Sequence, residues 1–477
     1  MKLCRIIIAD YQQFKLFDLD FRTQDGRIPD KICFIGKNGT GKTTLLKLIA
    51  SFIQNLKHGV DDDSYFTQNP TDKNRFIFEF EYNDKRYFCA FFLKSFNGKQ
   101  WKTFPKILLD TSALQELGLS YEDLLFSKNS ISLDSLFSWS NGLKNQHNTT
   151  QHKFTPYNYN NPNPISRELL IYSPAEFSPS WISDLYTSSN RNEAEKFFRE
   201  FPFYHEITPD HLKDFWGLVT YQRLKRAADR ENYRELPENS NKTVSKVESE
   251  FNSKNPDFLK ELSDLWTMIL DEAGIYFDHE SARNPIQLNE NLVAHFKLKN
   301  SGRVIPYHLM STGIKHLILR LGYMRALYFH RNVISSIMLI DEPENSLYPN
   351  LLYNIIETYT NKKKFPNTQS FFATHSPIVA AQFDREERVI LDFDDDKNVV
   401  YTKGIVPEGD DPNDILIKDF NIESILGEEG VKNWQRFIEL KILLNKTNDV
   451  RTRKAYLDEY LKIGSNYNFP VSNEVSK

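Results

Sequence analysis

The segment Lys31-Ile-Cys-Phe-Ile-Gly36-Lys-Asn-Gly-Thr-Gly-Lys42-Thr43-Thr44 decides the fold of this chain. Its first five residues form an apolar run, which is typical of a strand buried on both faces of a parallel sheet. The run leads into the pattern GxxxxGK[ST], and the apolar periodicity of the residues that follow predicts a helix. Strand, glycine-rich loop and helix together predict a phosphate-binding loop, because backbone N–H groups and the helix N-terminus attract phosphate oxygens.

This loop predicts a site for ATP and Mg²⁺. We expect Lys42 to reach the β- and γ-phosphates and Thr43 to supply a ligand to Mg²⁺. The alternative, an ordinary glycine-rich turn, is disfavoured by the position of the loop between a buried strand and a helix. The expected ATP-binding residues are Gly36, Lys37, Asn38, Gly39, Thr40, Gly41, Lys42, Thr43 and Thr44.

An acidic cluster follows a second apolar strand. The run Ile337–Ile340 leads into Asp341-Glu342-Pro-Glu344, which is the Walker B arrangement. We expect Asp341 to hold Mg²⁺, and Glu342 to orient and deprotonate the attacking water as a catalytic residue. The alternative is a solvated strand end whose acids lie in a turn, and the phosphate loop upstream favours the first interpretation.

Two further motifs lie near the acidic cluster in sequence. His375, in the stretch Thr-His-Ser-Pro, follows Asp341 by thirty-four residues. Because one βαβ step takes about 30 residues, we expect His375 to emerge beside Asp341 and to sense the γ-phosphate as a second catalytic residue. A structural histidine is the alternative. The motif Met310–Lys315 opens a predicted helix and could be an anion site or an ordinary helix cap.

Together these four motifs resemble the ATPase heads of the ABC type, which include the SMC, RecF and OLD-like groups. The resemblance implies an α/β P-loop NTPase fold, in which two heads dimerise around two ATP molecules and hydrolysis opens the pair. It also implies that a signature motif contacts the ATP of the other head; the matching residues are Ser311, Thr312, Gly313 and Lys315. The chain departs from that pattern at Ile314, where the group commonly has an acid, and the glutamine that senses Mg²⁺ cannot be placed.

The pattern of strands and helices predicts an ABC-type head with a large inserted lid and a C-terminal helical tail. The expected parts are an N-terminal lobe at 1–94, a lid at 95–289 with a flexible loop near 138–166, a C-terminal lobe at 290–404 and a tail at 405–477. The expected strands are 2–9, 14–21, 31–35, 76–82, 86–93, 292–298, 334–340 and 369–374, and the expected helices include 193–200, 209–234, 244–273, 314–331 and 349–362.

The tail suggests a partner. It resembles the helical tails of ATPases from bacterial anti-phage operons, the PtuA-like ATPases of Septu and retron-associated systems, which act with a separately encoded HNH-type nuclease. The resemblance therefore implies an ATPase that regulates a partner nuclease. A RecF/SMC-like DNA-maintenance ATPase and an assembly module that uses ATP as structural glue are the alternatives. The run Ile390–Asp396, ILDFDDD, is interpreted as a hairpin turn rather than a nuclease site, so no nuclease activity is expected of this chain.

Composition limits the class of protein. The 477 residues carry a net charge of −4, which excludes a wholly basic nucleic-acid binder. Three cysteines without a CxxC pair, and no apolar stretch near the ~20 residues of a membrane helix, predict a cytoplasmic protein without a membrane span. Basic residues gather at 85–106 and 213–234. Both stretches could bind nucleic acid, but a solvated strand face and a solvated helix face are the favoured interpretations.

Overall fold

The structure is a computed structural model of the chain. It describes residues 1–58, 75–82, 84–92, 95–96, 99–100, 106–111, 120–121, 168–175, 204–279, 296–305, 309–331, 333–422, 424–447, 449–467 and 469–470. Two compact units are present, Met1–Asp410 and Asp411–Lys477.

A seven-stranded sheet organises the first unit. The strands are parallel except for the last, which pairs antiparallel with its neighbour. Their order is β10 (Tyr204–Glu206), β9 (Glu168–Ser173), β13 (Ser335–Asp341), β14 (Thr368–Ala373), β3 (Lys31–Gly36), β15 (Arg388–Phe393) and β16 (Val399–Lys403). The predicted α/β fold is therefore confirmed, and the strand of the phosphate loop, β3, lies inside the sheet.

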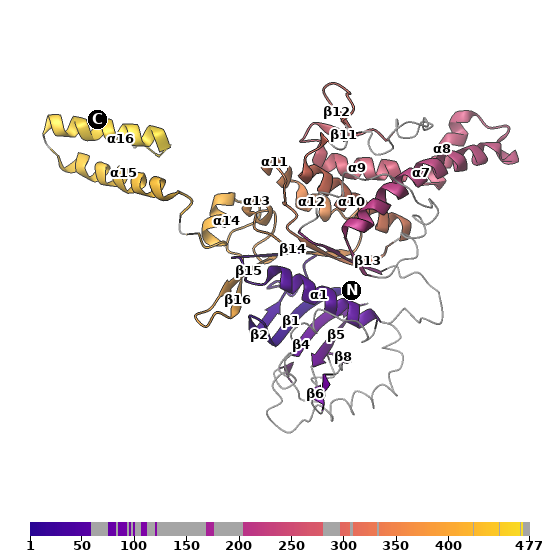
Figure 1. The fold of residues 1–477 in the computed structure, drawn as a ribbon, viewed down its shortest axis with the longest axis horizontal. Helices are drawn as coiled ribbons and strands as arrows, with labels where there is room; N and C mark the ends of the chain where they lie inside the picture. The colour runs from indigo at the N-terminus through magenta and orange to yellow at the C-terminus, as the bar shows by residue number, and fades with distance from the viewer. Residues whose placement is uncertain are drawn as a thin grey trace. The chain divides into compact units, whose positions relative to one another are not determined.

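One face of this sheet is covered by helix α1 (Lys42–His58) and by an antiparallel sheet (Figure 1). The order of the second sheet is β2 (Phe14–Asp20), β1 (Lys2–Tyr11), β4 (Arg75–Tyr82), β5 (Lys85–Phe92) and β8 (Lys106–Asp110). The core between these layers is rich in aromatic rings, and Phe52 of α1 stacks on Phe78 of β4 at 4.1 Å between ring centroids. The buried Gln369 joins the two sheets, because its amide exchanges hydrogen bonds with the backbone of Leu3.

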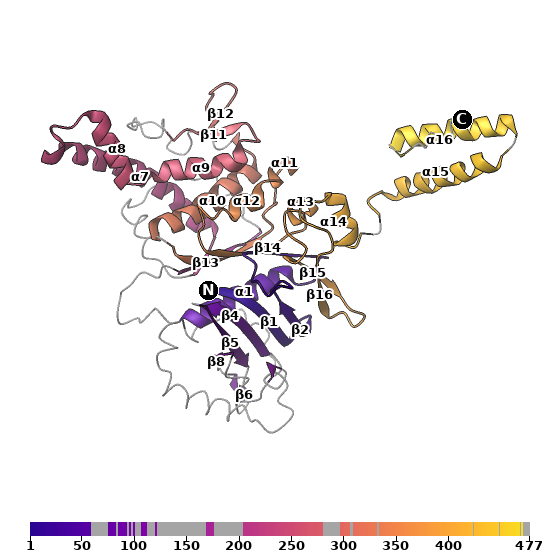
Figure 2. The same ribbon diagram turned by 180° about the vertical axis from the view of Figure 1, so that it is seen from behind.

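Helices cover the opposite face of the parallel sheet, as Figure 2 shows from behind. They include α7 (Pro209–Glu235), α9 (Phe258–Leu270), α10 (Thr312–Arg331) and α12 (Ile355–Tyr359). Trp266 of α9 is fully buried and donates its indole N–H to the carbonyl of Ile318 in α10. Short strands β11 (Ile275–Phe277) and β12 (Phe296–Leu298) pair next to α9, and β6 (Ser95–Phe96) pairs with β7 (Lys99–Gln100).

Two predicted helices are divided in the structure. The helix expected at 244–273 is α8 (Val244–Lys254) followed by α9, because Pro256 cannot continue a helix and Asp257 caps a new one through its carboxylate. The helix expected at 349–362 is α11 (Pro349–Leu352) and α12, separated where Asn354 leaves the helical backbone conformation.

The region expected as a separate lid contributes strands to both sheets. Strands β9 and β10 lie in the parallel sheet and β8 lies in the antiparallel sheet. The helix expected at 193–200 and the loop expected at 138–166 lie outside the described residues. Among the described helices, none has both the length and the apolar character needed to cross a membrane. Cys4, Cys33 and Cys89 are buried free thiols, so the described cysteines form no disulfide.

The second unit contains α14 (Pro412–Lys418) and a pair of longer helices, α15 (Glu428–Lys446) and α16 (Val450–Tyr467). The two long helices pack through a small core of their own: Phe437, Leu440, Leu444, Tyr460 and Phe469. Phe437 stacks on Tyr460 at 4.2 Å between ring centroids, and Arg436 of α15 pairs with Glu459 of α16 at 2.8 Å. The predicted helical tail is therefore present.

Candidate nucleotide site

The predicted motifs meet where three neighbouring parallel strands end. Strand β14 lies between β3 and β13, and Asp341 at the end of β13 is opposite Ala373 of β14. His375 follows Ala373 by two residues, so the segment that carries it leaves β14 at the same edge of the sheet as Asp341. In open parallel sheets, ligands bind outside the carboxyl ends of the strands. We call this place the carboxyl edge of the sheet.

The phosphate loop joins β3 to α1 at the carboxyl edge. Gly36 has a φ of +146°, and a Cβ there would lie 2.2 Å from the carbonyl oxygen of Leu391, so a larger residue would collide with strand β15. The Lys42 ammonium lies within the loop and donates to the carbonyls of Gly36 at 2.8 Å and Lys37 at 3.1 Å. Burial lowers the pKa of Lys42 to about 8, although the carboxylate of Asp341 opposes this shift.

Thr43 and Asp341 bring the loop and the acidic strand end into direct contact. The Thr43 hydroxyl donates to Oδ2 of Asp341 at 2.8 Å. Burial raises the pKa of Asp341, the Thr43 hydrogen bond opposes that shift, and the charge of Glu342 adds to it. A hydroxyl and a carboxylate are oxygen ligands of the kind that Mg²⁺ prefers. A cation between them would stabilise the Asp341 carboxylate, so the residues present fit Mg²⁺.

Glu342 follows Asp341 in a backbone conformation that side chains rarely adopt. Its φ is +45°, and its N–H donates to the carbonyl of Ala373 at 2.8 Å. Such conformations are costly and are concentrated at functional sites. The Glu342 carbonyl accepts a hydrogen bond at 3.3 Å from Arg320, a buried residue of α10. Arg320 also donates to the carbonyl of Ala175, just after β9, at 2.9 Å.

Glu344 connects the acidic cluster to the segment that carries His375. Its Oε1 accepts from the Thr374 hydroxyl at 2.7 Å and from the His375 backbone N–H at 2.8 Å. Burial raises the pKa of Glu344. The His375 side chain is open to solvent on one side only, and its partial burial together with the nearby Lys42 ammonium lowers its pKa. The imidazole is therefore biased toward its neutral form.

The signature-like motif lies at the N-terminus of α10. Ser311 and Thr312 are exposed, Lys315 is half-buried, and Gly313 is buried. A Cβ on Gly313 would lie only 1.9 Å from the carbonyl oxygen of Ser346, in the loop after the acidic cluster. Gly313 therefore permits a backbone-to-backbone contact within its own chain. A cavity of about 230 Å³ lies between these two segments, with Tyr348 on its wall.

Two residues of this site were missed from the sequence. Arg320 looked like one polar residue of an amphipathic helix, and Glu344 looked like a third acid in a turn. Only the topology shows that they reach Glu342 and His375. The glutamine that senses Mg²⁺ in ABC-type heads is still not placed. The described residues directly after β9, which ends opposite Ile340, are Pro174 and Ala175. The sequence contained no signal for these contacts.

The structure describes part of each of the two basic stretches. In the first, Lys85 and Arg86 at the start of β5 are exposed, while Tyr87 and Phe88 that follow them are buried. The side chains of Lys94, Lys99, Lys102 and Lys106 lie outside the described residues. In the second stretch, the arginines at 226, 230 and 234 bond to α8 or to the segment that follows it.

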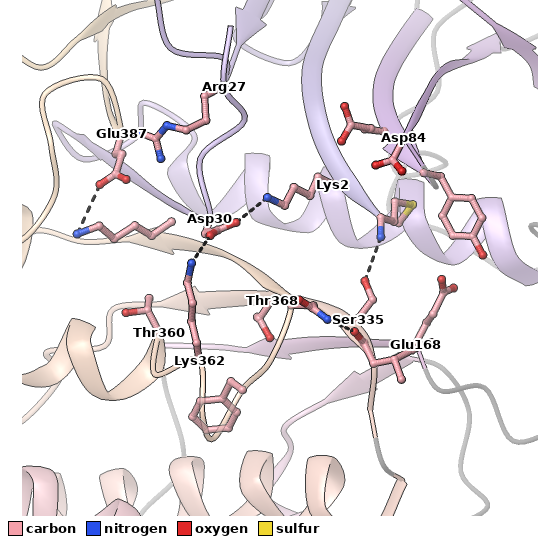
Figure 3. Close-up of a pocket in the computed structure, with 17 residues that line it drawn as sticks. Lys2, Arg27, Asp30, Asp84, Glu168, Ser335, Thr360, Lys362, Thr368 and Glu387 are labelled. Carbon is pink, nitrogen blue, oxygen red and sulfur yellow. Dashed lines mark hydrogen bonds and ion pairs between the residues drawn. The ribbon is translucent and has the colours of Figure 1, made fainter. Parts of the chain in front are cut away.

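A larger cavity, about 830 Å³, lies at the other ends of the same parallel strands (Figure 3). Asp30 in this cavity pairs with Lys2 at 2.7 Å and with Lys362 at 2.9 Å. Lys31 pairs with Glu408 at 2.8 Å and with Glu387 at 3.5 Å. We call this place the amino edge of the sheet. No motif of the sequence analysis lies there.

Comparisons with known proteins identify a family and two solved structures of low similarity. Two solved structures are similar over most of the chain, each at 10% sequence identity and a TM-score of 0.38. One is the SMC head domain from Thermotoga maritima, covering 85% of this chain and 100% of that chain. The other is the SMC head bound to the C-winged helix domain of ScpA, covering 84% and 98%. No curated protein matches the chain. The family model of the AAA ATPase domain matches residues 1–380, and the chain therefore belongs to the AAA ATPase domain family.

Proposed function

We propose that the carboxyl edge binds Mg·ATP and hydrolyses it to ADP and phosphate. The observation that carries this proposal is the 2.8 Å contact between Thr43 of the phosphate loop and Asp341 of the acidic strand end. Two segments nearly 300 residues apart meet there with oxygen ligands for one cation. Lys42 lies in the same loop, with its ammonium on backbone carbonyls that phosphate oxygens can replace.

Each residue of the site has a separate role in the proposed hydrolysis. Backbone N–H groups of the loop and Lys42 bind the β- and γ-phosphates. Bound Mg²⁺, held by Thr43 and Asp341, would neutralise charge on the phosphates. Glu342 accepts a proton from the attacking water, whose oxygen bonds to the γ-phosphorus as the bond to the β–γ bridging oxygen breaks. His375, kept in place by Glu344, contacts the γ-phosphate and detects its release.

We also propose that two heads face each other around ATP. Ser311, Thr312 and Lys315 would reach the nucleotide of the second copy. In support, Ser311 and Thr312 are exposed, and so are the large apolar side chains of Leu309 and Tyr348, which lie 69% and 70% exposed next to the motif. Gly313 has a different part in this arrangement, since its close approach to Ser346 couples the motif to the acidic loop of the same head.

The tail is proposed to dock a partner, and a nuclease of HNH type is the partner that the resemblance to anti-phage ATPases suggests. In support, Trp434, Ile438 and Ile442 recur every four residues along α15 and are 37%, 38% and 49% exposed. Ile438 and Ile442 lie outside the small core of the two helices, whereas the Trp434 ring also contacts Phe437 and Phe469 of that core. Purification from the native operon tests the partner: a deletion of 427–477 should keep ATP hydrolysis and lose the co-purifying nuclease, whereas loss of ATP binding would contradict a docking role.

The experiment for ATP binding is calorimetry on Lys42→Ala with Lys47→Ala as the matched control. Both residues belong to α1, and only Lys42 is buried in the loop. We expect Lys42→Ala to weaken Mg·ATP binding by at least tenfold, the scale of a charge-assisted phosphate contact. Lys47→Ala should bind within a few-fold of wild type. Unchanged affinity in Lys42→Ala would contradict the assignment of the phosphate loop.

A further inference from the structure

The hairpin of β15 and β16 contains the run ILDFDDD and has no part in the proposed hydrolysis. It lies directly against the phosphate loop. Leu391 of β15 is opposite Gly36, the first residue of the loop, in a parallel ladder. The next residue, Asp392, reaches the loop with its side chain, since Lys37 Nζ lies 3.2 Å from its Oδ1. Phe393 therefore continues past the end of the ladder alongside the loop.

The turn between β1 and β2 meets the loop at the same place. The Gln13 side-chain amide donates to the carbonyl of Gly39 at 3.3 Å. The Gln13 carbonyl accepts from the N–H of Val399, which pairs with Phe393 across the hairpin, at 2.9 Å. Two hairpins that are far apart in sequence are thus joined to each other and to the outer side of the phosphate loop.

Phe393 is an aromatic side chain left open to solvent at this junction. It is 38% exposed, and its ring tip lies 4.0 Å from the point that a Cβ on Gly39 would occupy. The neighbouring rings of Tyr11, Phe14 and Phe17 are buried in the core and have no free face of this kind. An exposed ring beside a phosphate loop offers a flat apolar surface to a ligand that the loop holds.

The order of strands indicates which end of a nucleotide would meet this ring. The hydrolytic groups Asp341, Glu342 and His375 come from β13 and β14, on one side of β3. The γ-phosphate must lie toward them. Strand β15 is on the other side of β3, so the end of the ligand opposite to the γ-phosphate points toward the β15–β16 hairpin.

We propose that Phe393 is the stacking platform for the base of a nucleoside triphosphate bound by the phosphate loop. The inference rests on the proposed function, because the loop must hold the triphosphate for the base to reach the ring. Stacking on an aromatic ring tolerates every base and contributes about 1–3 kcal/mol per base. The site therefore favours nucleoside triphosphates over inorganic triphosphate, and it gains affinity from the base without a strict choice among bases.

The test compares two ligands, Mg·ATP and Mg·tripolyphosphate, on wild type and three variants by titration calorimetry. Phe393→Ala should bind ATP about tenfold more weakly, the scale of one lost stacking contact, and bind tripolyphosphate as wild type does. Phe393→Trp should keep the ATP affinity of wild type. Because the chain already has six tryptophans, its fluorescence is compared with that of wild type: ATP should quench it more strongly than it quenches wild type, and tripolyphosphate should not. Val400→Ala, an exposed site on the facing strand, is the control and should change neither affinity.

The other outcomes separate this inference from the function on which it rests. Unchanged ATP affinity in Phe393→Ala would overturn the stacking platform while leaving the phosphate loop assigned. An equal loss for both ligands would also overturn it, because the ring would then support the loop rather than the base. If wild type binds neither ligand, the proposed ATP site itself fails, and the platform fails with it.

Discussion

Charged side chains lie at both edges of the parallel sheet, but their pKa values are shifted in opposite directions: toward the charged form at Asp30, and toward the neutral form at Asp341 and Lys42. At the amino edge, Asp30 lies between Lys2 and Lys362; although burial opposes the shift, these ammonium groups hold the pKa of Asp30 below its ordinary value. At the carboxyl edge, burial raises the pKa of Asp341 and lowers that of Lys42. At the amino edge the charges inside the cavity of about 830 Å³ form ion pairs with one another, whereas the carboxyl edge keeps charges that a Mg²⁺ ion and a polyphosphate would stabilise. The directions of these shifts distinguish the two aspartates: ion pairing stabilises the charged form of Asp30, whereas burial destabilises that of Asp341.

The largest effect is expected at the carboxyl edge, from Glu342→Gln. The amide cannot accept a proton from the attacking water, so hydrolysis should slow by at least ~10²-fold while ATP still binds. Steady-state phosphate release and ATP binding, measured on the same preparation, check both parts. The same variant with ATP should accumulate as a closed pair of heads in light scattering. Turnover within a few-fold of wild type would show that Glu342 is not the base.

The pH dependence of ATP binding follows from Lys42. Its pKa of about 8 in the free protein means that the ammonium loses its proton as the pH rises above 8. Phosphate binding needs the charged form, so ATP affinity should be constant below that pH and fall by up to about tenfold for each pH unit above it. Calorimetry between pH 7 and 9.5 measures this slope. Lys42→Ala should bind weakly with a much flatter profile, and an equally steep profile in that variant would assign the titration to another group.

A smaller effect is expected from Gly313→Ala. The added methyl group would overlap the Ser346 carbonyl, so α10 and the acidic loop must separate, at a cost of about 1–3 kcal/mol. We expect a melting temperature several degrees lower and slower hydrolysis, since the loop begins at Glu342. Ser346→Ala, which leaves the carbonyl in place, is the control and should behave as wild type. A Gly313→Ala protein with unchanged stability would mean that the two segments separate freely.

The smallest effect is expected at the amino edge. Asp30→Asn breaks the two ion pairs with Lys2 and Lys362, which are partly exposed, so the loss of stability should be below about 1 kcal/mol. ATP affinity and hydrolysis should not change. Thermal unfolding and phosphate release measure both. A clear loss of hydrolysis in this variant would mean that the two edges are coupled, and the contrast between them would need revision.

The parts of the fold that local sequence determines were predictable. The phosphate loop is one continuous segment, and the strand that ends in Asp341 has an apolar pattern that only a buried strand explains. The number of residues between Asp341 and His375 predicted that the strands before them are neighbours, because one βαβ step has a narrow range of lengths. The breaks at Pro256 and Asn354 were missed because apolar periodicity continues across them. Arg320, Glu344 and Phe393 could not be assigned, since their contacts depend on which strands become neighbours in the sheet.

The central claim is that the loop and the acidic strand end form one Mg·ATP site, and titration of ATP into Glu342→Gln protein tests it most directly. Because this variant is expected to hydrolyse ATP very slowly, the heat measured in the titration comes from binding alone. Each titration is done once with Mg²⁺ and once with EDTA. The account predicts one ATP per chain, bound more tightly with Mg²⁺, and the loss of this Mg²⁺ dependence when Asp341→Asn is added. An absence of ATP binding, or a Mg²⁺ dependence that survives Asp341→Asn, would contradict it.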